Sequence, residues 1–271
     1  MISRTLATLS TLLALRKNST VSNVTTATKQ GLSLLLAPSL GRGAEDFSVL
    51  AANLRMLGYT VLTPEPFGMD VSDNLADATL ETLGQHLLDA APQDGSGLVV
   101  IGHAFGNWVA RMAAVLSPER VAAVVLLAAA RQVIPTDIKP SIDGSFNPAL
   151  GDSERLQHLQ RAYFAPGNDA GAWLHGWHPS MAAGQRAAAA RSDRSHWWHA
   201  GGVVPILDVQ AAEDAIAPAS EAMELRTELG ARVTNITIEN AGHALLPEQP
   251  AEVAEAIDAF VRRLESRKNV S

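Results

Sequence analysis

The stretch Leu98-Val99-Val100-Ile101-Gly102-His103-Ala104-Phe105-Gly106 carries the most informative pattern in the chain, an apolar run that ends in Gly-x-Ala-x-Gly. The run predicts a buried strand, and the residues after it predict a helix whose buried face comprises Val109, Met112, Ala113 and Leu116. The two glycines leave room for a sharp turn because they carry no Cβ. We therefore expect Ala104 at the tip of a tight strand-to-helix turn.

Two further strand-and-loop segments follow downstream. Residues 204–210 predict a strand, and the loop after it carries Glu213 and Asp214. Residues 233–238 predict a second strand, in which polar and apolar side chains alternate, and His243 lies in the loop that follows. The final helix is expected to begin at Pro250 and to bury Val253, Ile257, Phe260, Val261 and Leu264.

Together, these segments resemble the α/β-hydrolases, in which a strand ends in Gly-x-Ser-x-Gly and the chain order is nucleophile, acid, histidine. The resemblance runs from about residue 32 to residue 264. It implies an α/β fold with a mostly parallel sheet, helices on both faces and a helical cap inserted after the sixth strand, residues 121–127. Residues 121–127 are numbered as the sixth strand because the fold is expected to include one or more strands before residue 31.

The same resemblance implies the catalytic positions. Ala104 stands where the family has its serine nucleophile, Asp214 matches the acid and His243 matches the general base. Glu213 is an alternative acid, and Asp137 and Asp143 are further candidates.

Two backbone N–H groups are expected to form an oxyanion hole. In the family, the loop after the first parallel strand usually begins His-Gly, whereas Pro38-Ser39 stand in that place here. The resemblance therefore implies Leu40 as the first donor and Phe105 as the second, and both would act through the backbone.

The chain is expected to divide into a leader or N-terminal surface segment (residues 1–30), a hydrolase core (31–130 and 203–271) and a helical cap (131–202). Large aromatic side chains concentrate in the cap segment, and such side chains suit a concave apolar ligand site. They are Phe164, Trp173, Trp177, Trp197 and Trp198. The alternative is that these rings pack the cap onto the core.

Composition limits the class of partner. The chain has 271 residues, 47% of them hydrophobic, and a formal net charge of −7, which argues against a nucleic-acid partner. No apolar stretch is long enough to cross a bilayer. We expect a small-molecule substrate and no membrane partner, and the sequence leaves a homodimer open.

No metal and no cofactor are expected. The chain has no cysteine, so it has neither a disulfide framework nor a thiolate nucleophile. Two histidine pairs have the His-x-x-His spacing that zinc could use, His175 with His178 and His196 with His199. Neither pair encloses the glutamate of a His-Glu-x-x-His motif, so hydrogen-bonded or solvated histidines are expected.

Residues 1–30 contain no acid, and the first carboxylate in the chain belongs to Glu45. This composition resembles an amphipathic transit segment, but no Ala-x-Ala cleavage site follows. The favoured alternative is a surface helix followed by the first strand or strands of the fold. A cytoplasmic location is the default, with organelle targeting or export through residues 1–30 as the alternative.

The alanine at position 104 leaves three explanations. The first is a Ser-to-Ala change that inactivates a serine hydrolase. The second is a natural alanine in an enzyme whose His–Asp pair acts directly, as in cofactor-free oxygenases and lyases that resemble this fold. The third is a ligand-binding protein of hydrolase ancestry. Residues 102–107, Gly-His-Ala-Phe-Gly-Asn, resemble bacterial hydrolase-like chains with a native alanine. We expect a hydrolase of esterase or lactonase type for a small, apolar or aromatic molecule.

Overall fold

A computed structural model describes residues 31–129, 135–218 and 223–268. Its centre is an open sheet in the strand order β2-β1-β3-β4-β5-β6, and each neighbouring pair is parallel. The strands are β1 (Leu32–Ala37), β2 (Thr60–Leu62), β3 (Gly97–His103), β4 (Val121–Leu127), β5 (Ile206–Ala211) and β6 (Val233–Ile238).

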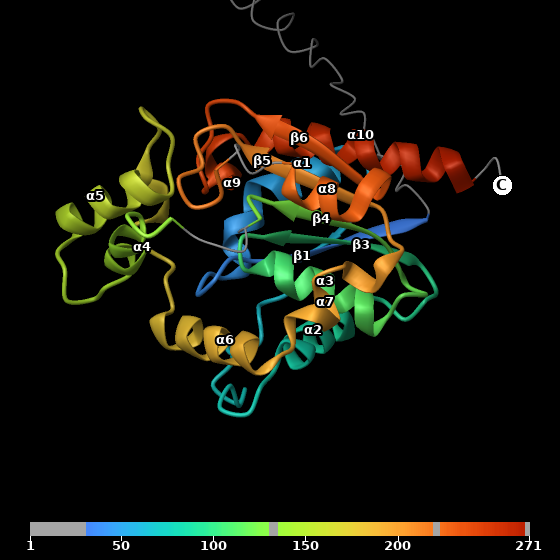
Figure 1. Cartoon of the computed structure of the whole chain (residues 1–271), viewed down its shortest axis with the longest axis horizontal. Helices are drawn as coiled ribbons and strands as arrows, with labels where there is room; N and C mark the ends of the chain where they lie inside the picture. Colours follow the sequence, from blue (N-terminus) through green and yellow to red (C-terminus); the bar gives the residue numbers. More distant parts are fainter. Residues whose placement is uncertain (1–30, 130–134, 219–222, 269–271) are drawn as a thin grey trace, which may run out of the picture.

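Helices cover both faces of this sheet, as Figure 1 shows. The core helices are α1 (Ser48–Met56), α2 (Leu80–Asp89), α3 (Gly106–Leu116), α8 (Glu224–Leu229), α9 (Leu245–Glu248) and α10 (Pro250–Lys268). Between β4 and β5 lie α4 (Lys139–Ser145), α5 (Asp152–Ala162), α6 (Pro179–Arg191) and α7 (Arg194–Trp197). Short 3₁₀ turns are η1 (Ala44–Phe47), η2 (Ala170–Trp173), η3 (Ala200–Gly202) and η5 (Gly230–Arg232).

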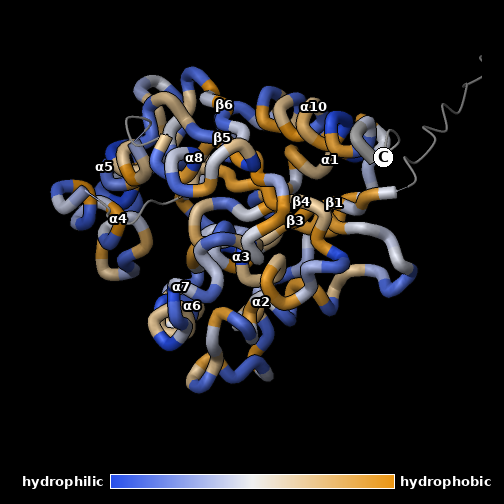
Figure 2. The backbone as a smooth tube through the Cα atoms, turned by 45° about the vertical axis from the view of Figure 1, so that its right-hand side comes forward, coloured by the Kyte–Doolittle hydropathy of each residue, from blue (hydrophilic) through white to orange (hydrophobic). Residues whose placement is uncertain are grey.

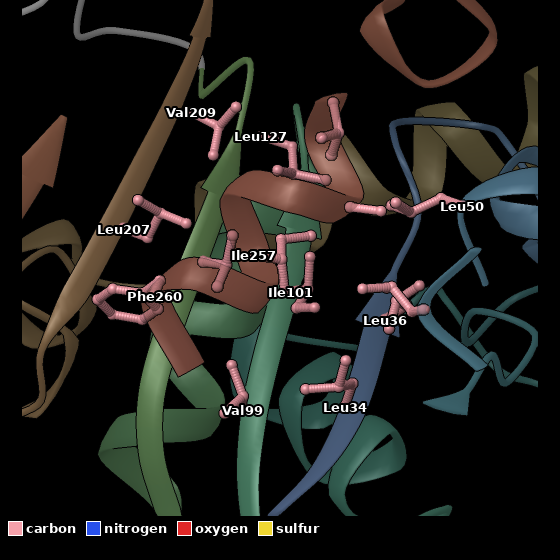
Figure 3. Packing of buried hydrophobic residues seen from close by; sticks show 14 of the residues in the cluster. Leu34, Leu36, Leu50, Val99, Ile101, Leu127, Leu207, Val209, Ile257 and Phe260 are labelled. Carbon is pink, nitrogen blue, oxygen red and sulfur yellow. The ribbon is translucent and has the colours of Figure 1, made fainter. Parts of the chain in front are cut away.

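The alternation of side chains along the strands divides the interior into two layers. Leu34 and Leu36 of β1 point to one face, where they join a buried cluster with α1 and α10. Leu35 points to the other face and joins a cluster with α2 and α3. Figure 3 shows the first cluster, in which Ile257 and Phe260 of α10 lie over the strands. Each leucine so buried contributes about 1.5–3 kcal/mol of hydrophobic stabilisation.

The hydropathy of the chain follows this layering. In Figure 2 the central strands β1, β3 and β4 are predominantly hydrophobic. Central parallel strands are covered on both faces, so they need apolar side chains on each. β6 lies at the end of the strand order, and its Thr237 is exposed while Ile238 is buried.

The predicted fold class is therefore confirmed. The strands appear where the apolar runs predict them, with ends shifted by one or two residues. The strand or strands predicted before residue 31 lie outside the described residues. Residues 131–202 hold the helices α4 to α7 in their described part, and the division into core and cap stays a prediction. No helix in the described ranges is both long and apolar enough to cross a membrane.

The turn between β3 and α3 is packed against backbone on both sides. A Cβ on Gly102 would lie 2.2 Å from the carbonyl oxygen of Gly106, and a Cβ on Gly106 would lie 2.1 Å from the carbonyl oxygen of Ala37. Both glycines are therefore required by close approach of the main chain. The contact at Gly106 brings the start of α3 against the end of β1.

We predict that Gly106→Ala lowers the free energy of unfolding by about 2 kcal/mol or more, because the new methyl group would overlap backbone atoms that cannot rotate away. Urea unfolding followed by tryptophan fluorescence measures the change. Gly151→Ala is the matched control, since nothing lies within 4 Å of a Cβ built there. A Gly106→Ala protein as stable as the control would contradict this account of the turn.

Candidate active site

Ala104 occupies the tip of the turn in a conformation that non-glycine residues rarely adopt. Its φ is +48°, in the left-handed region. Its N–H donates to the carbonyl of Leu127 in β4 (2.9 Å), and its own carbonyl accepts from the backbone N–H of Asn107 (3.1 Å) and from the Asn107 side chain. Neighbouring elements thus hold the strained residue in place.

His243 and Asp214 form a buried hydrogen-bonded pair. The distance from His243 Nδ1 to Asp214 Oδ2 is 2.9 Å, and both residues are less than 5% exposed. The backbone N–H groups of Ile216 and Ala217 each donate to Asp214 Oδ1 at 2.8 Å. These two donors hold the carboxylate in position. The carboxylate in turn orients the imidazole ring, so that Nε2 lies on the edge opposite Nδ1.

The three alternative acids lie elsewhere. Glu213 Oε2 accepts from the backbone N–H of Ala241 (3.1 Å). Asp137 and Asp143 form exposed, loose pairs with Arg161 (3.8 Å) and Arg186 (3.9 Å). Asp214 is therefore the acid that the structure places on the histidine.

The loop that carries His243 docks onto the segment after α5. The backbone N–H of Ala244 donates to the carbonyl of Tyr163 (2.8 Å), and a Cβ on Gly242 would lie 2.5 Å from that same oxygen. Glu248 accepts from the N–H of Gly242 (2.7 Å). The position of the histidine therefore depends on the segment between β4 and β5 as well as on the sheet.

His103, to which the sequence analysis gave no role, supports the same loop. Its Nε2 lies 2.8 Å from the carbonyl oxygen of His243, and its ring meets Trp173 edge-on at 5.7 Å between centroids. Burial lowers the pKa of His103 to about 3. A neutral ring therefore donates its Nε2–H to the carbonyl at neutral pH.

A cavity of about 150 Å³ opens beside Ala104. It is lined by Ser39, Leu40, Ala104, Phe105, Trp108, Ile142, Phe146, Tyr163, Trp177, Arg186, Ile216 and His243. Its walls follow the carboxyl ends of β1, β3, β5 and β6, the edge at which α/β sheets bind ligands. The cavity thus unites the predicted nucleophile position and the predicted base in one apolar space.

Both residues predicted for the oxyanion hole, Leu40 and Phe105, line this cavity. The close approach of Gly106 to the end of β1 brings their two loops together. Neither backbone N–H donates a hydrogen bond to another described residue. Their role as donors stays a prediction, supported by this placement.

The predicted substrate-binding aromatic residues separate into two groups. Trp177 lines the cavity, whereas Trp173 is buried and is not among its lining residues, and Phe164 packs edge-on against Trp173. Trp197 packs against Trp108, and Trp198 lies under the guanidinium groups of Arg111 and Arg194. The latter two tryptophans therefore belong to the packing below α3, which is the alternative that the sequence left open.

Several lining residues escaped the sequence analysis, namely Ser39, Trp108, Ile142, Phe146, Tyr163, Arg186 and Ile216. Trp108 could have been found, because it lies four residues after Ala104 and hence one helical turn away. Phe146 directly follows α4 and Arg186 lies in α6, and the packing of these helices leaves no signal in the local sequence pattern.

A buried arginine ties the loop after β1 to this same region. The guanidinium of Arg42 pairs with Asp46 (Nε to Oδ2, 2.8 Å) and donates to the carbonyl of His175. It also lies over the rings of Trp173 and Trp177, 4.9 and 4.7 Å from their centroids. Such a desolvated cation is stabilised by its carboxylate and the two ring faces together.

The histidine pairs do not converge on a common point. His196 Nδ1 lies 3.6 Å from Glu81, and His199 Nε2 lies 3.0 Å from Glu228. No group of three or more histidine, aspartate or glutamate side chains in the described ranges is placed to hold a metal ion.

Residues 34–256 match the model of the alpha/beta hydrolase family, and the chain belongs to that family. No curated protein sequence matches it.

Solved structures share its fold. One, named as a non-haem bromoperoxidase (BpoC) from Mycobacterium tuberculosis H37Rv, is 18% identical, with a TM-score of 0.68 over 88% of this chain and 94% of that one. A thermophilic esterase from Thermogutta terrifontis is 21% identical (TM-score 0.66, 88% and 92%). A hydrolase from Pseudomonas aeruginosa PA01 is 22% identical (TM-score 0.66, 87% and 91%). At these identities the likeness shows the fold alone.

The depressed pKa of His103 predicts a pH dependence of stability. The unfolded chain binds a proton at this histidine below about pH 6.5, whereas the folded chain binds it only near pH 3. The stabilising contribution of the neutral His103 ring to the free energy of unfolding is therefore complete above pH 6.5. It is lost as the pH falls toward 3. We expect His103→Gln to flatten this decline in urea unfolding between pH 7 and 4.5. His175→Gln, an exposed histidine, is the control. If the free energy of unfolding falls equally steeply with decreasing pH in the wild type and in His103→Gln, the prediction is refuted.

Proposed function

We propose that this protein hydrolyses an ester, lactone or related acyl bond without a nucleophile at position 104, using His243 as a general base on water. The observation that carries the proposal is the buried His243–Asp214 pair, which opens onto the same apolar cavity as Ala104. Alanine can neither attack an acyl carbon nor accept or donate a proton. The histidine is the lining side chain with the ring nitrogen that a general base requires.

In the proposed reaction, His243 Nε2 takes a proton from a water molecule as its oxygen adds to the acyl carbon. Asp214 stabilises the imidazolium that forms. The N–H groups of Leu40 and Phe105 donate to the resulting oxyanion, where each such donor is worth about 2.7–4 kcal/mol. Collapse of the tetrahedral intermediate expels the alkoxide, which recovers the proton from His243 and leaves a carboxylic acid.

The substrate expected here is small and apolar or aromatic. The cavity walls are predominantly aromatic and aliphatic, and such walls favour an apolar ligand body. The esterase and hydrolase names among the similar structures support the acyl-bond class. The alternative among acyl-bond hydrolases is that this chain is a serine hydrolase in which alanine at position 104 has replaced the nucleophile and abolished activity.

A second candidate is a non-hydrolytic role, either a His–Asp enzyme of the oxygenase or lyase type or a ligand-binding protein. The enclosed aromatic cavity favours ligand binding under either of these. The intact pair favours an enzyme, because a binding protein has no use for a histidine held by a buried carboxylate.

We predict that His243→Ala lowers kcat/KM for an activated aryl ester such as 4-nitrophenyl acetate by about 100-fold or more, the usual contribution of a general base. Asp214→Asn should lower it as well, because the amide cannot stabilise the imidazolium. His199→Ala, an exposed histidine, is the control. Turnover that survives in His243→Ala would exclude the proposed mechanism.

Ala104→Ser tests whether a serine would be activated at this position. We expect a fluorophosphonate to label residue 104 in the variant and an acyl-enzyme burst to precede steady turnover of the ester. Wild-type turnover that depends on His243 supports direct His–Asp chemistry. If only Ala104→Ser is active, the wild type is a serine hydrolase inactivated by its alanine. If neither protein turns over ester while a ligand quenches tryptophan fluorescence, the binding role is correct.

A further inference from the structure

The cavity beside Ala104 has an apolar body and one cationic side chain at its rim. Arg186 of α6 is the lining residue with a permanent charge. Its side chain is 48% exposed, and its guanidinium lies 5.5 Å from the centroid of the Phe146 ring. A permanent charge on an otherwise apolar wall suggests that the ligand carries a complementary group there.

A continuous series of ring contacts separates Arg186 from the proposed base. Starting at His243, the centroid of Tyr163 is 5.7 Å away, and Trp177 is a further 5.7 Å from Tyr163. Trp177 stacks on Phe146 at 5.4 Å, and Phe146 lies under Arg186. These rings thus form a continuous aromatic wall that links the cation to the proposed base.

Arg186 is weakly engaged by the protein. Its nearest acid is Asp143, at 3.9 Å from Nη2 to Oδ1, and the Asp143 side chain is 71% exposed. Such exposed pairs contribute little, because water screens both charges. No hydrogen bond joins Arg186 to another residue in the described part of the chain. Its planar donors are thus available to a ligand, and a guanidinium fits a carboxylate in a bidentate arrangement.

Tyr163 offers a second donor along the same wall. The residue is only 5% exposed and lines the cavity, yet its hydroxyl makes no hydrogen bond with any described residue. The hydroxyl oxygen keeps some accessible surface, so a ligand in the cavity can accept a hydrogen bond from it. Burial raises the pKa of Tyr163 above its usual range, so the hydroxyl keeps its proton and can donate.

We propose that Arg186 and Tyr163 form a carboxylate subsite, so that the substrate is an acidic ester whose free carboxylate lies across an apolar spacer from the acyl carbon. This inference rests on the proposed function, because His243 marks the acyl end of the cavity. A cavity of about 150 Å³ is comparable to an engineered one that holds benzene. The cavity therefore has room for an apolar body of about one aromatic ring.

The matched probes are 4-acetoxybenzoate and 4-acetoxybenzamide, which differ in charge at the position para to the ester. We expect the wild type to hydrolyse the carboxylate with a kcat/KM about tenfold above that of the amide, as one charged hydrogen bond implies. Arg186→Gln should abolish this preference, so that the carboxylate and the amide are hydrolysed with equal kcat/KM. Tyr163→Phe should reduce the preference about threefold. Arg161→Gln removes an exposed cation of α5 that does not line the cavity, and it should change neither rate.

Binding of the products provides a readout that needs no turnover. Titration with 4-hydroxybenzoate and 4-hydroxybenzamide, followed by calorimetry, should show the same preference and the same dependence on Arg186. If no ester is hydrolysed but this preference holds, the carboxylate subsite stands while the proposed reaction fails. If both products bind equally well, or if Arg186→Gln keeps the preference, the subsite is wrong whatever the enzyme hydrolyses.

Discussion

The close approach of Gly106 to the end of β1 is the constraint on which the site depends. It leaves no room for a side chain and presses the start of α3 against the loop that carries Ser39 and Leu40. Phe105 and Leu40 thereby line the same cavity. Ala104 is held by a hydrogen bond from its N–H to the carbonyl of Leu127 in β4. Three parallel strands therefore fix the geometry of a few backbone atoms, and side-chain identity at those positions matters little.

The second constraint comes from the helices between β4 and β5. The backbone N–H of Gly41 donates to the buried Gln185 of α6 (2.9 Å), and the N–H of His178 donates to the carbonyl of Gly41 (2.9 Å). The loop after β1 is therefore bound on one side by the sheet and on the other by α6. The same helix carries Arg186, so the proposed carboxylate subsite and the proposed oxyanion hole share one support.

Much of this arrangement could be predicted from the sequence, because it depends on local patterns and chain order. Apolar runs locate the strands, the two glycines locate the turn, and the order of Asp214 and His243 places both at the carboxyl edge of a parallel sheet. The cavity wall could not be predicted in the same way. Tyr163, Phe146 and Arg186 meet through tertiary packing of helices whose sequence patterns do not encode their partners. Trp197 and Trp198, predicted as ligand contacts, pack next to α3 and are not among the residues that line the cavity.

The left-handed backbone at Ala104 has a consequence for how fold and reactivity are related in this chain. The strain is imposed by Gly102, Gly106 and the neighbouring strands, so it is present whether residue 104 carries a methyl or a hydroxymethyl group. An exchange between alanine and serine would therefore be close to neutral for folding while it changes the reacting atom. The turn is thus a position at which the reacting atom can change while the fold that presents it stays the same.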